Sequence, residues 1–204
     1  MYLFYDTETS GLPDYRTSLN AKWQPHIVQL AALLTDDAGN DLASVDLIVR
    51  PDGWRIPDNV AAIHGITEEK AAECGIPEKR AVEIFLALAT IAGRRVAHND
   101  PFDARIVSIA IARMYEKVVA GWWQDLPHEC TMKMASPIMQ MEPTERMIAA
   151  GRNHHKNPRL SEAYEHLIGE ELVGAHDAMV DVRACKRIFF EMKALTPQDG
   201  AEYG

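Results

Sequence analysis

A nearly continuous apolar run at His26–Asp36, HIVQLAALLTD, most constrains how this chain can fold. A strand that is apolar on both faces has to be covered on both sides, as central strands of α/β sheets are. The turn residues Ala38–Asn40 follow it, and Leu42–Pro51 then alternates in polarity, which predicts a strand paired back on the first. With a short apolar strand at Tyr2–Tyr5, these segments predict a three-stranded meander.

Helical patterns dominate the rest of the chain. A further buried strand is predicted at Arg94–Asn99, and helices are predicted at Pro77–Ile91, Pro101–Tyr115, Cys130–Met139, Leu160–Ile168 and Ala178–Lys193. Asn99 or Asp100 is the expected N-cap of the helix that starts at Pro101, and Gly169 is an expected C-cap. This pattern predicts an α/β domain, a mixed sheet flanked by helices, over residues 1–194, with residues 195–204 as a flexible tail.

Composition limits the function classes. No apolar run reaches the roughly 18 residues that span a bilayer, and no secretion signal is visible, so we expect a cytoplasmic protein without a membrane partner. Cys74, Cys130 and Cys185 are scattered and are expected to be buried thiols. The net charge of −9 argues against a generic polyanion binder, unless carboxylates bind metal or the cations cluster. They do cluster in GRNHHKNPR, Gly151–Arg159, which is otherwise read as a solvated loop.

Two carboxylates directly follow the first predicted strand, at Asp6 and Glu8 in the segment LFYDTETSGL. Side chains alternate along a strand, so these two residues project to the same side. Carboxylates held that close repel each other, and a cation such as Mg²⁺ or Mn²⁺ between them removes the repulsion. The simpler alternative is that Asp6 caps a turn and Glu8 is solvated, because a lone D-x-E pattern is common.

Two further aspartates begin the apolar stripes of predicted helices. The stripes are Asp103, Val107, Ala110 and Met114 in one helix and Asp181, Cys185, Ile188 and Met192 in the other. Both have the spacing of a single helix face. An unpaired carboxylate buried there is strongly unfavourable, so these charges need a partner. A shared metal site would provide one, and local salt bridges to Arg105 or Arg183 are the alternative.

A histidine precedes the second of these stripes. His176 lies just ahead of the last helix, which Asp177 is expected to cap. Neighbouring negative charge raises the pKa of a histidine towards neutrality, which suits a general base. A surface or capping role is the alternative.

These residues together resemble the three motifs of the DEDDh, or DnaQ-like, 3′→5′ exonucleases. Asp6-x-Glu8 resembles the first motif, HNDPFD (His98–Asp103) the second and HDAMVD (His176–Asp181) the third. IHGIT, Ile63–Thr67, is similar to another family segment, and several stretches look most like bacterial exonuclease I and proofreading exonuclease subunits. The resemblance implies a ribonuclease H-like fold with a five-stranded mixed sheet.

The resemblance also implies a two-metal phosphodiesterase. Asp6, Glu8, Asp103 and Asp181 would hold two divalent cations, Mg²⁺ or Mn²⁺, and His176 would take a proton from the attacking water. The residues implied to contact the terminal nucleotide are Thr7, Thr9, Gly11, Leu12, His64, His98, Asn99 and Phe102. Phe102 can instead be a core anchor. The basic segment precedes the third motif, where relatives touch the substrate strand, so Arg152, Lys156 and Arg159 are predicted phosphate contacts.

The predicted function is a metal-dependent 3′→5′ exonuclease that releases nucleoside 5′-monophosphates. The expected partner is a nucleic-acid 3′ end, with single-stranded DNA favoured. An RNA-trimming exoribonuclease is the alternative within the same chemistry, since no motif reports on the 2′-hydroxyl. A binding subunit with a vestigial site and a purely structural acidic domain are the alternatives from other classes. A homodimer and a polymerase or replication partner both stay open.

Overall fold

The predicted meander is present in the computed structural model, which describes residues 1–115 and 117–195. β1 (Tyr2–Thr9) pairs antiparallel with β2 (Ile27–Thr35), and β2 pairs antiparallel with β3 (Asp41–Arg50). All nine residues of β2 are buried, as its apolar sequence requires. β2 is therefore a central strand with a covered surface on each face.

Three shorter strands complete the sheet, whose order is β4-β3-β2-β1-β5-β6. β5 (Arg94–Ala97) lies parallel between β1 and β6 (His128–Cys130), and β4 (Ile76–Pro77) pairs parallel with β3. The described residues thus form six strands where five were expected. The residue patterns predicted neither β4 nor β6, because strands of two and three residues have no periodicity. β4 forms where Gly75 approaches β3 so closely that a Cβ there would lie 2.6 Å from the Arg50 nitrogen.

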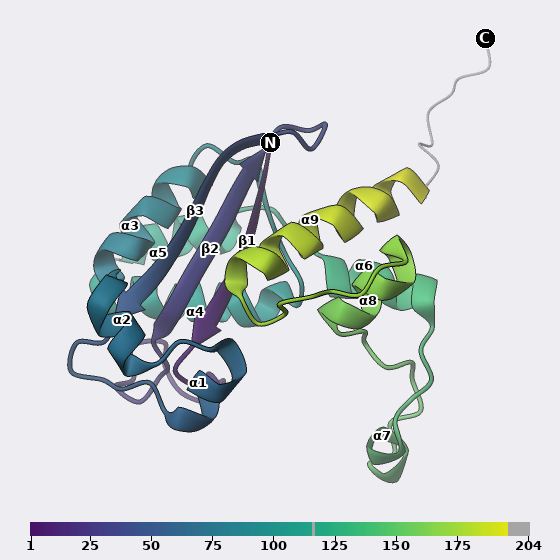
Figure 1. Ribbon diagram of the computed structural model, residues 1–204, viewed down its shortest axis with the longest axis horizontal. Coiled ribbons are helices and arrows are strands. Elements are labelled where there is room, and N and C mark those ends of the chain that lie inside the picture. The colour runs from purple at the N-terminus through teal and green to yellow at the C-terminus, as the bar shows by residue number, and fades with distance from the viewer. Residues whose placement is uncertain (116, 196–204) are drawn as a thin grey trace.

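Helices cover both faces of the sheet (Figure 1). The helices α3 (Glu78–Ala89), α4 (Asp100–Met114) and α5 (Lys117–Asp125) belong to one side, and α9 (Ala178–Leu195) crosses the other. On that second side α6 (Thr131–Met139) and α8 (Leu160–Ile168) pack against α9. The alternation of β1 serves both layers, because Tyr5 packs with Phe85 of α3 while Phe4 packs with Phe189 of α9.

All five predicted helices are present, with ends within two residues of the prediction. Gly169 is the C-cap of α8 with a φ of 78°, as expected. Asn99 takes the N-cap position of α4 in a left-handed conformation, but its side chain caps no backbone group. Four helices were not predicted: α1 (Asp58–His64), α2 (Glu68–Cys74), α5 and α7 (Glu145–Ala149). Leu195 ends α9, and the rest of the predicted tail lies outside the described residues.

The cysteine expectation is correct at two positions and wrong at one. Cys130 and Cys185 are buried, whereas Cys74 is exposed on α2 and its thiol donates to the Lys70 carbonyl at 3.1 Å. The last turn of this short helix faces water, so an apolar residue type is no guide to burial there. Among the described helices, none has both the length and the apolar content needed to cross a bilayer.

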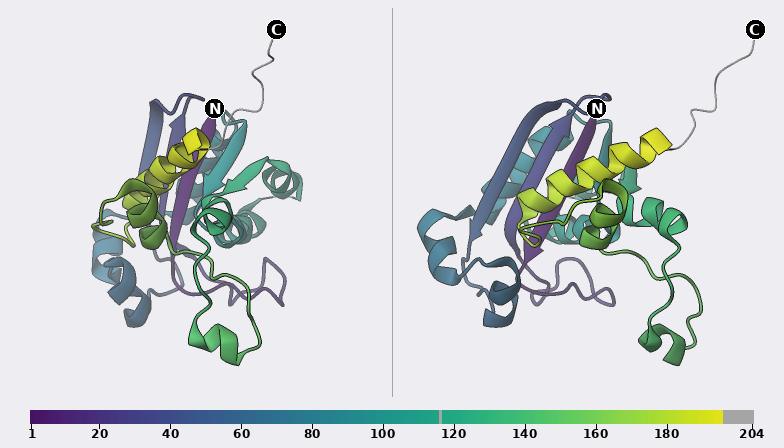
Figure 2. Two further views of the ribbon diagram at one scale, coloured as in Figure 1. Left: turned by 90° about the vertical axis from the view of Figure 1, so that its right-hand side faces the viewer. Right: turned by 45° about the vertical axis from the view of Figure 1, so that its right-hand side comes forward.

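Two excursions leave the body of the domain (Figure 2). One is the loop between β1 and β2, residues 10–26, and the other is an arm of residues 140–159 that carries α7. Both lie at the end of the sheet where β1 ends, so they flank whatever site is built there.

Candidate active site

The site begins where β1 runs past its neighbour. β5 pairs with β1 only as far as Phe4, so the far end of β1 has no strand on that side. The start of α4 fills the gap. The Thr7 amide donates to Asp103 Oδ1 at 3.0 Å, and the Thr7 hydroxyl donates to the same oxygen at 2.7 Å. An unpaired strand end thus fixes the first carboxylate of the helix.

Asp6 and Glu8 lie on the opposite face of β1 from the Thr7 side chain. β1 is four residues longer than predicted, which places both carboxylates within the strand and two residues apart, as required for a shared face. They continue the face of Phe4, which packs against α9. Both are half-buried, while the intervening Thr7 is buried. The predicted common orientation is therefore confirmed by the strand geometry.

The N-terminus of α9 is held over this face by Gln29, a buried residue of β2. Its Oε1 accepts from the Ala178 amide at 3.1 Å, and its Nε2 donates to Asp46 at 2.8 Å. Asp177 caps the helix as predicted, accepting from the Met179 and Val180 amides at 3.0 and 3.1 Å. Gln29 was not among the predicted site residues. Its signal was a single amide side chain inside an otherwise apolar strand, where it must have polar partners.

Asp181 follows in the first turn of α9 and is buried. Its Oδ2 accepts from the His176 amide at 3.2 Å, and its Oδ1 has no hydrogen-bond partner among the described residues. His176 has a φ of 70°, a left-handed conformation that is costly for a residue with a Cβ. Ligand atoms of Glu8, His176 and Asp181 lie within 4.8 Å of one another. The strained turn therefore brings the exposed His176 ring to the carboxylates.

Burial raises the pKa of all four carboxylates, and at Asp6 and Glu8 the charges of the other members raise it further. Burial raises the pKa of Glu8 to about 8, helped by the charges of Asp181 and Asp103. Burial also raises the pKa of Asp103 to about 7, against the hydrogen bonds from Thr7, and that of Asp181 to about 6. The pKa of Asp6 lies well above its usual range because of burial and then the charges of Asp103, Asp181 and Glu8. Burial is the largest cause at each of the four positions, because it disfavours the charged form of a carboxylate.

The salt bridges offered as an alternative are not formed. Arg105 donates to the carbonyls of Asp14 and Thr17 at 3.2 and 3.0 Å, and Arg183 pairs with Asp41 at 3.3 Å. Within the described part of the chain, no arginine or lysine is paired with Asp6, Glu8, Asp103 or Asp181. An all-oxygen donor set with an unpartnered buried Asp181 oxygen fits hard divalent cations.

The predicted nucleotide contacts after Glu8 line the start of the loop. Thr7 and Thr9 are buried, and the Thr9 hydroxyl donates to the Gly11 carbonyl at 2.7 Å. A Cβ at Gly11 would meet nothing within 4 Å, so the backbone there is open to a close approach. Leu12 is 84% exposed, an unusual setting for a large apolar side chain next to a buried strand.

The remaining predicted nucleotide contacts differ in what their side chains already bind. His64 is buried, its Nδ1 accepts from the Ile66 amide at 3.1 Å, and its Nε2 has no partner. His98 has partners at both nitrogens, Thr131 Oγ1 at 3.0 Å and the Pro158 carbonyl at 3.1 Å. Asn99 is exposed and its side chain makes no cap bond, and Phe102 packs partly into the core. His64 thus has a free donor, whereas His98 ties α6 and the arm to the site.

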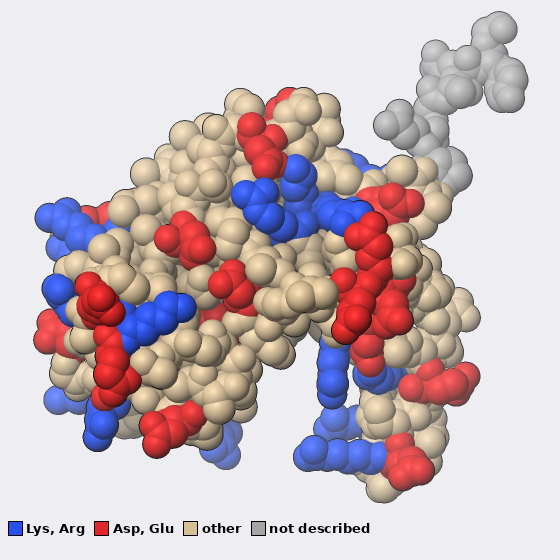
Figure 3. All heavy atoms as spheres, viewed as in Figure 1, with Lys and Arg blue, Asp and Glu red and all other residues tan. Residues whose placement is uncertain are grey.

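The basic segment forms part of the arm, and Figure 3 shows a cleft between the arm and the body with Lys and Arg side chains on the arm. Arg152 and Arg159 are exposed. The Lys156 ammonium is paired with Glu162, which also accepts from the Arg159 amide at 2.7 Å. Two of the three predicted phosphate contacts therefore present exposed guanidinium groups with no ion pair to the described residues, and the third is partly neutralised.

Comparisons with known proteins match this geometry. The RNase_T exonuclease family matches residues 3–189. Exonuclease I of E. coli, in a zinc-bound complex with single-stranded DNA, superposes with a TM-score of 0.70 at 24% identity, covering 97% of this chain and 41% of that one. Its complex with a dA16 oligonucleotide superposes with a TM-score of 0.70 at 24% identity, covering 96% of this chain and 41% of that one. Exonuclease I of Methylocaldum szegediense superposes with a TM-score of 0.72 at 21% identity, covering 97% of this chain and 41% of that one.

The chain thus spans about two fifths of the length of these exonucleases. No curated protein matches it by sequence. At such identities the structural likeness shows the ribonuclease H-like fold, as predicted. The family match extends over nearly the whole described chain and shows the family. This chain belongs to the RNase_T exonuclease family, as its resemblance to DnaQ-like exonucleases predicted.

Proposed function

We propose that the chain is a 3′→5′ exonuclease that hydrolyses the last phosphodiester bond of a nucleic acid and releases nucleoside 5′-monophosphates. The observation that carries this proposal is the cluster of four carboxylates, all with raised pKa values and none paired with a lysine or arginine of the described residues. Such a cluster is unfavourable for stability by itself. Such a cluster is expected where carboxylates bind divalent cations that in turn contact a phosphate group.

Asp6, Glu8, Asp103 and Asp181 would hold two Mg²⁺ or Mn²⁺ ions. Bound there, such ions favour ionisation of the attacking water and neutralise charge on the phosphate and on the leaving 3′-oxygen. The chain itself fixes the carboxylates: Thr7 orients Asp103, and the His176 amide orients Asp181. Strand geometry aligns Asp6 with Glu8.

His176 would accept, on a ring nitrogen, a proton from the attacking water. Its ring is exposed and lies on a turn rather than in the core, so it reaches both the carboxylates and solvent. Neighbouring negative charge supports the protonated imidazole that forms. Return of the proton to bulk water completes the cycle, because an exposed imidazole exchanges protons freely.

The terminal nucleotide would lie against the Thr7–Leu12 segment, with Leu12 beside the last base. His64 Nε2 carries the ring proton, since Nδ1 accepts from an amide, and would donate it to the nucleotide. Asn99 and Phe102 would border the same pocket. His98 would act on substrate through the position of the arm, because both its nitrogens are occupied.

DNA is the favoured substrate and a single strand the favoured form. Support comes from the solved neighbours, which are exonuclease I structures with DNA oligonucleotides. The arm would contact backbone phosphates through Arg152 and Arg159, with a smaller contribution from Lys156.

The test is digestion of 5′-labelled and 3′-labelled oligonucleotides of DNA and RNA with Mg²⁺, Mn²⁺ or chelator. We expect 3′-labelled DNA to release labelled mononucleotide at once, and 5′-labelled DNA to shorten stepwise. His176→Ala should slow hydrolysis by about 10²–10⁴-fold. Glu73→Gln, which removes an exposed carboxylate on α2, should cleave like the unaltered chain. No cleavage with either ion, or release from the 5′ end, would overturn the proposal.

A further inference from the structure

The loop between β1 and β2 is a closed and ordered structure, although it has no helix or strand of its own. Its neck is fastened by the Ser10 amide to the His26 carbonyl at 3.0 Å and by the His26 amide to Ser10 Oγ at 2.9 Å. Between these residues the chain forms the kind of compact surface loop that often carries function. The neck directly follows Glu8, so the loop is joined to the candidate active site.

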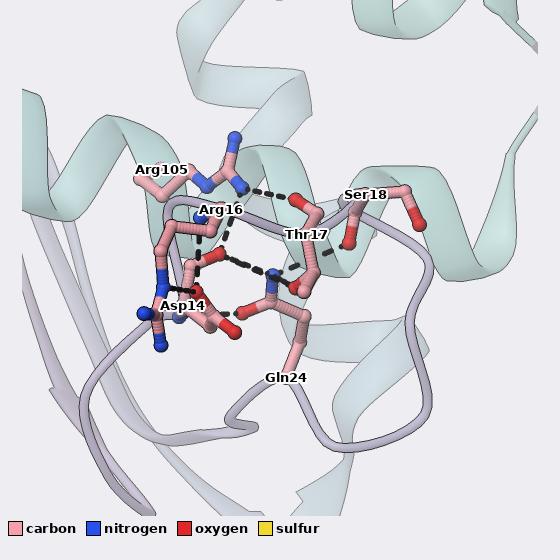
Figure 4. Close-up of polar contacts among 6 residues, drawn as sticks. All are labelled: Asp14, Arg16, Thr17, Ser18, Gln24 and Arg105. Carbon is pink, nitrogen blue, oxygen red and sulfur yellow. Dashed lines mark hydrogen bonds and ion pairs between the residues drawn. The ribbon is translucent and has the colours of Figure 1, made fainter.

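The interior of the loop is filled by one amide side chain (Figure 4). Gln24 is 2% exposed, accepts from the Asp14 amide at 3.0 Å and donates to the Asp14 carbonyl at 2.8 Å. It also donates to Thr17 Oγ1 and the Ser18 carbonyl at 3.1 and 3.2 Å. Arg105 of α4 reaches in from outside and donates to the carbonyls of Asp14 and Thr17. The backbone of the loop is therefore fixed from two sides.

This fixed loop presents two aromatic rings to water. Trp23 is 70% exposed and Tyr15 is 61% exposed. Both rings lie beside charged groups of the loop and of α4: the Arg16 amide and then the Trp23 side chain lower the pKa of the Asp14 carboxyl, and the Arg105 guanidinium lies 5.5 Å from the Tyr15 ring centre. A hollow of about 240 Å³ opens beside Tyr15, between the loop and the helices α4 and α5. Apolar rings held rigidly in water make a contact surface rather than a core.

The charge of the loop identifies the class of ligand. Arg16 and Lys22 are exposed and are sequence neighbours of Tyr15 and Trp23. Arg16 is paired at 3.5 Å with Asp14, the only acid between Ser10 and His26, but its side chain stays 93% exposed. The loop is therefore basic in a chain whose net charge is −9. Rigid aromatic rings next to cations are the features that bind single-stranded nucleic acid, because bases stack on the rings while phosphates meet the cations. A protein partner would not need this charge.

We propose that Trp23 and Tyr15 form a stacking platform for bases upstream of the terminal nucleotide, with Arg16 and Lys22 beside the intervening phosphates. The platform rests on the proposed function for the identity of its ligand. It lies at the same end of the sheet as the carboxylates, and the arm flanks that end as well, so one strand can run from the platform to the site (Figure 2). The platform would give affinity without base identity, since every base has a π-face.

Equilibrium binding of a 5′-fluorescent DNA strand of about 12 nucleotides, measured by anisotropy in chelator, tests the platform without cleavage. We expect Trp23→Ala and Tyr15→Ala each to weaken binding about five- to tenfold, the lower end of the effect of a lost base stack. Trp23→Phe keeps a ring and should lose less. Ile91→Ala is the matched control, because Ile91 is 55% exposed at the opposite end of the sheet and should bind as the unaltered chain does.

A second series replaces one nucleotide at a time by an abasic residue. The unaltered chain should lose affinity when the abasic residue lies at a particular upstream position, and Trp23→Ala should be indifferent at that position. Binding and abasic sensitivity that are unchanged in both alanine variants would overturn the platform and leave the surface to a protein partner. If the chain cleaves DNA but Trp23→Ala and Tyr15→Ala bind it as the unaltered chain does, the platform alone is refuted. If binding is weakened in the two alanine variants but the chain cleaves nothing, the hydrolytic function alone is refuted. If the chain neither binds nor cleaves DNA, both proposals are refuted.

Discussion

Asp100 and Asp103 lie three residues apart at the start of α4, and their surroundings are opposite in kind. Both are almost fully buried, at 1% and 3% exposure. Asp100 accepts from the Tyr5 hydroxyl at 2.8 Å and forms an ion pair with Arg95 at 3.3 Å. Asp103 accepts only uncharged donors, the amide and hydroxyl of Thr7. One helix turn thus contains a carboxylate with its own cation and a carboxylate without one.

The difference distinguishes a carboxylate that stabilises the core, Asp100, from one that is proposed to bind a metal ion, Asp103. Arg95 is itself fixed, donating to the Trp123 and Leu126 carbonyls and stacking 4.4 Å from the Trp123 ring centre. The chain therefore supplies both a hydrogen-bond donor and a cationic partner to Asp100 in the core. At Asp103 the chain supplies two uncharged hydrogen-bond donors and no cationic side chain among the described residues. A buried carboxylate in that setting favours the binding of a cation from solution. The proposed metal site rests on this difference, because Asp103 has no cationic side chain as a partner among the described residues.

The largest effect should come from Asp103→Asn. The amide keeps the size of the side chain and removes the charge, so hydrolysis should fall about 10³-fold or more. Stability should not fall, because an unpaired buried charge is lost. Cleavage rates and urea unfolding of the same preparation check both parts. Activity within tenfold of the unaltered chain would remove Asp103 from the site.

Asp100→Asn should show the reverse pattern. The Arg95 guanidinium would remain buried without its anion, and the free energy of unfolding should drop by about 3–5 kcal/mol. The rate of hydrolysis per folded molecule should stay close to that of the unaltered chain. Urea unfolding measures the loss. The double variant Arg95→Met with Asp100→Leu should recover much of it, and a failure to recover would mean that the pair does more than balance charge.

The sequence predicted the unpaired carboxylates better than the paired one. Asp6 and Glu8 follow a strand period, while Asp103 and Asp181 follow helix stripes, so local patterns alone placed each of them correctly. Asp100 drew attention only as a possible cap. Its partner Arg95 is on β5 and Tyr5 is on β1, and no local pattern joins residues of three different elements.

The unpredicted parts of the fold likewise depend on contacts between residues that are far apart in the sequence. β4 depends on how close Gly75 comes to β3, and the position of α9 depends on Gln29 of a distant strand. Of the loop after β1, only Gly11 and Leu12 were given a predicted role, as contacts of the terminal nucleotide. The order of the loop comes from Gln24 filling its interior, which depends on contacts between residues that have no regular spacing.

Divalent cations should stabilise the chain by an amount that depends on pH. Without them, the raised pKa values mean that the folded chain binds more protons than the unfolded chain between the ordinary Glu8 value of 4.5 and the folded value of about 8. Stability of the metal-free chain should therefore fall as pH rises through that interval. Saturating Mg²⁺ at pH 8 should restore about 2–3 kcal/mol. Thermal unfolding with and without chelator measures this.

The control for that effect is Asp103→Asn, in which the pH dependence should flatten and the Mg²⁺ shift should shrink, because one of the raised groups is gone. Asp100→Asn should keep both, since Asp100 has its own cation. A metal-free chain that becomes more stable from pH 5 to pH 8 would contradict the assignment of unpaired carboxylates to the folded state.

The smallest effects should come from the arm, where the same contrast between paired and unpaired charge recurs. Arg152→Gln and Arg159→Gln should each lower the slope of log affinity against log salt by about 0.7, the value for one phosphate contact to a single strand. Lys156→Gln should change the slope less, because Glu162 already pairs with that ammonium. Titrations of labelled DNA in chelator at several salt concentrations measure the three slopes. Equal changes at all three positions would show that the Lys156–Glu162 pair opens when nucleic acid binds, and no change at any of them would make the segment a solvated loop.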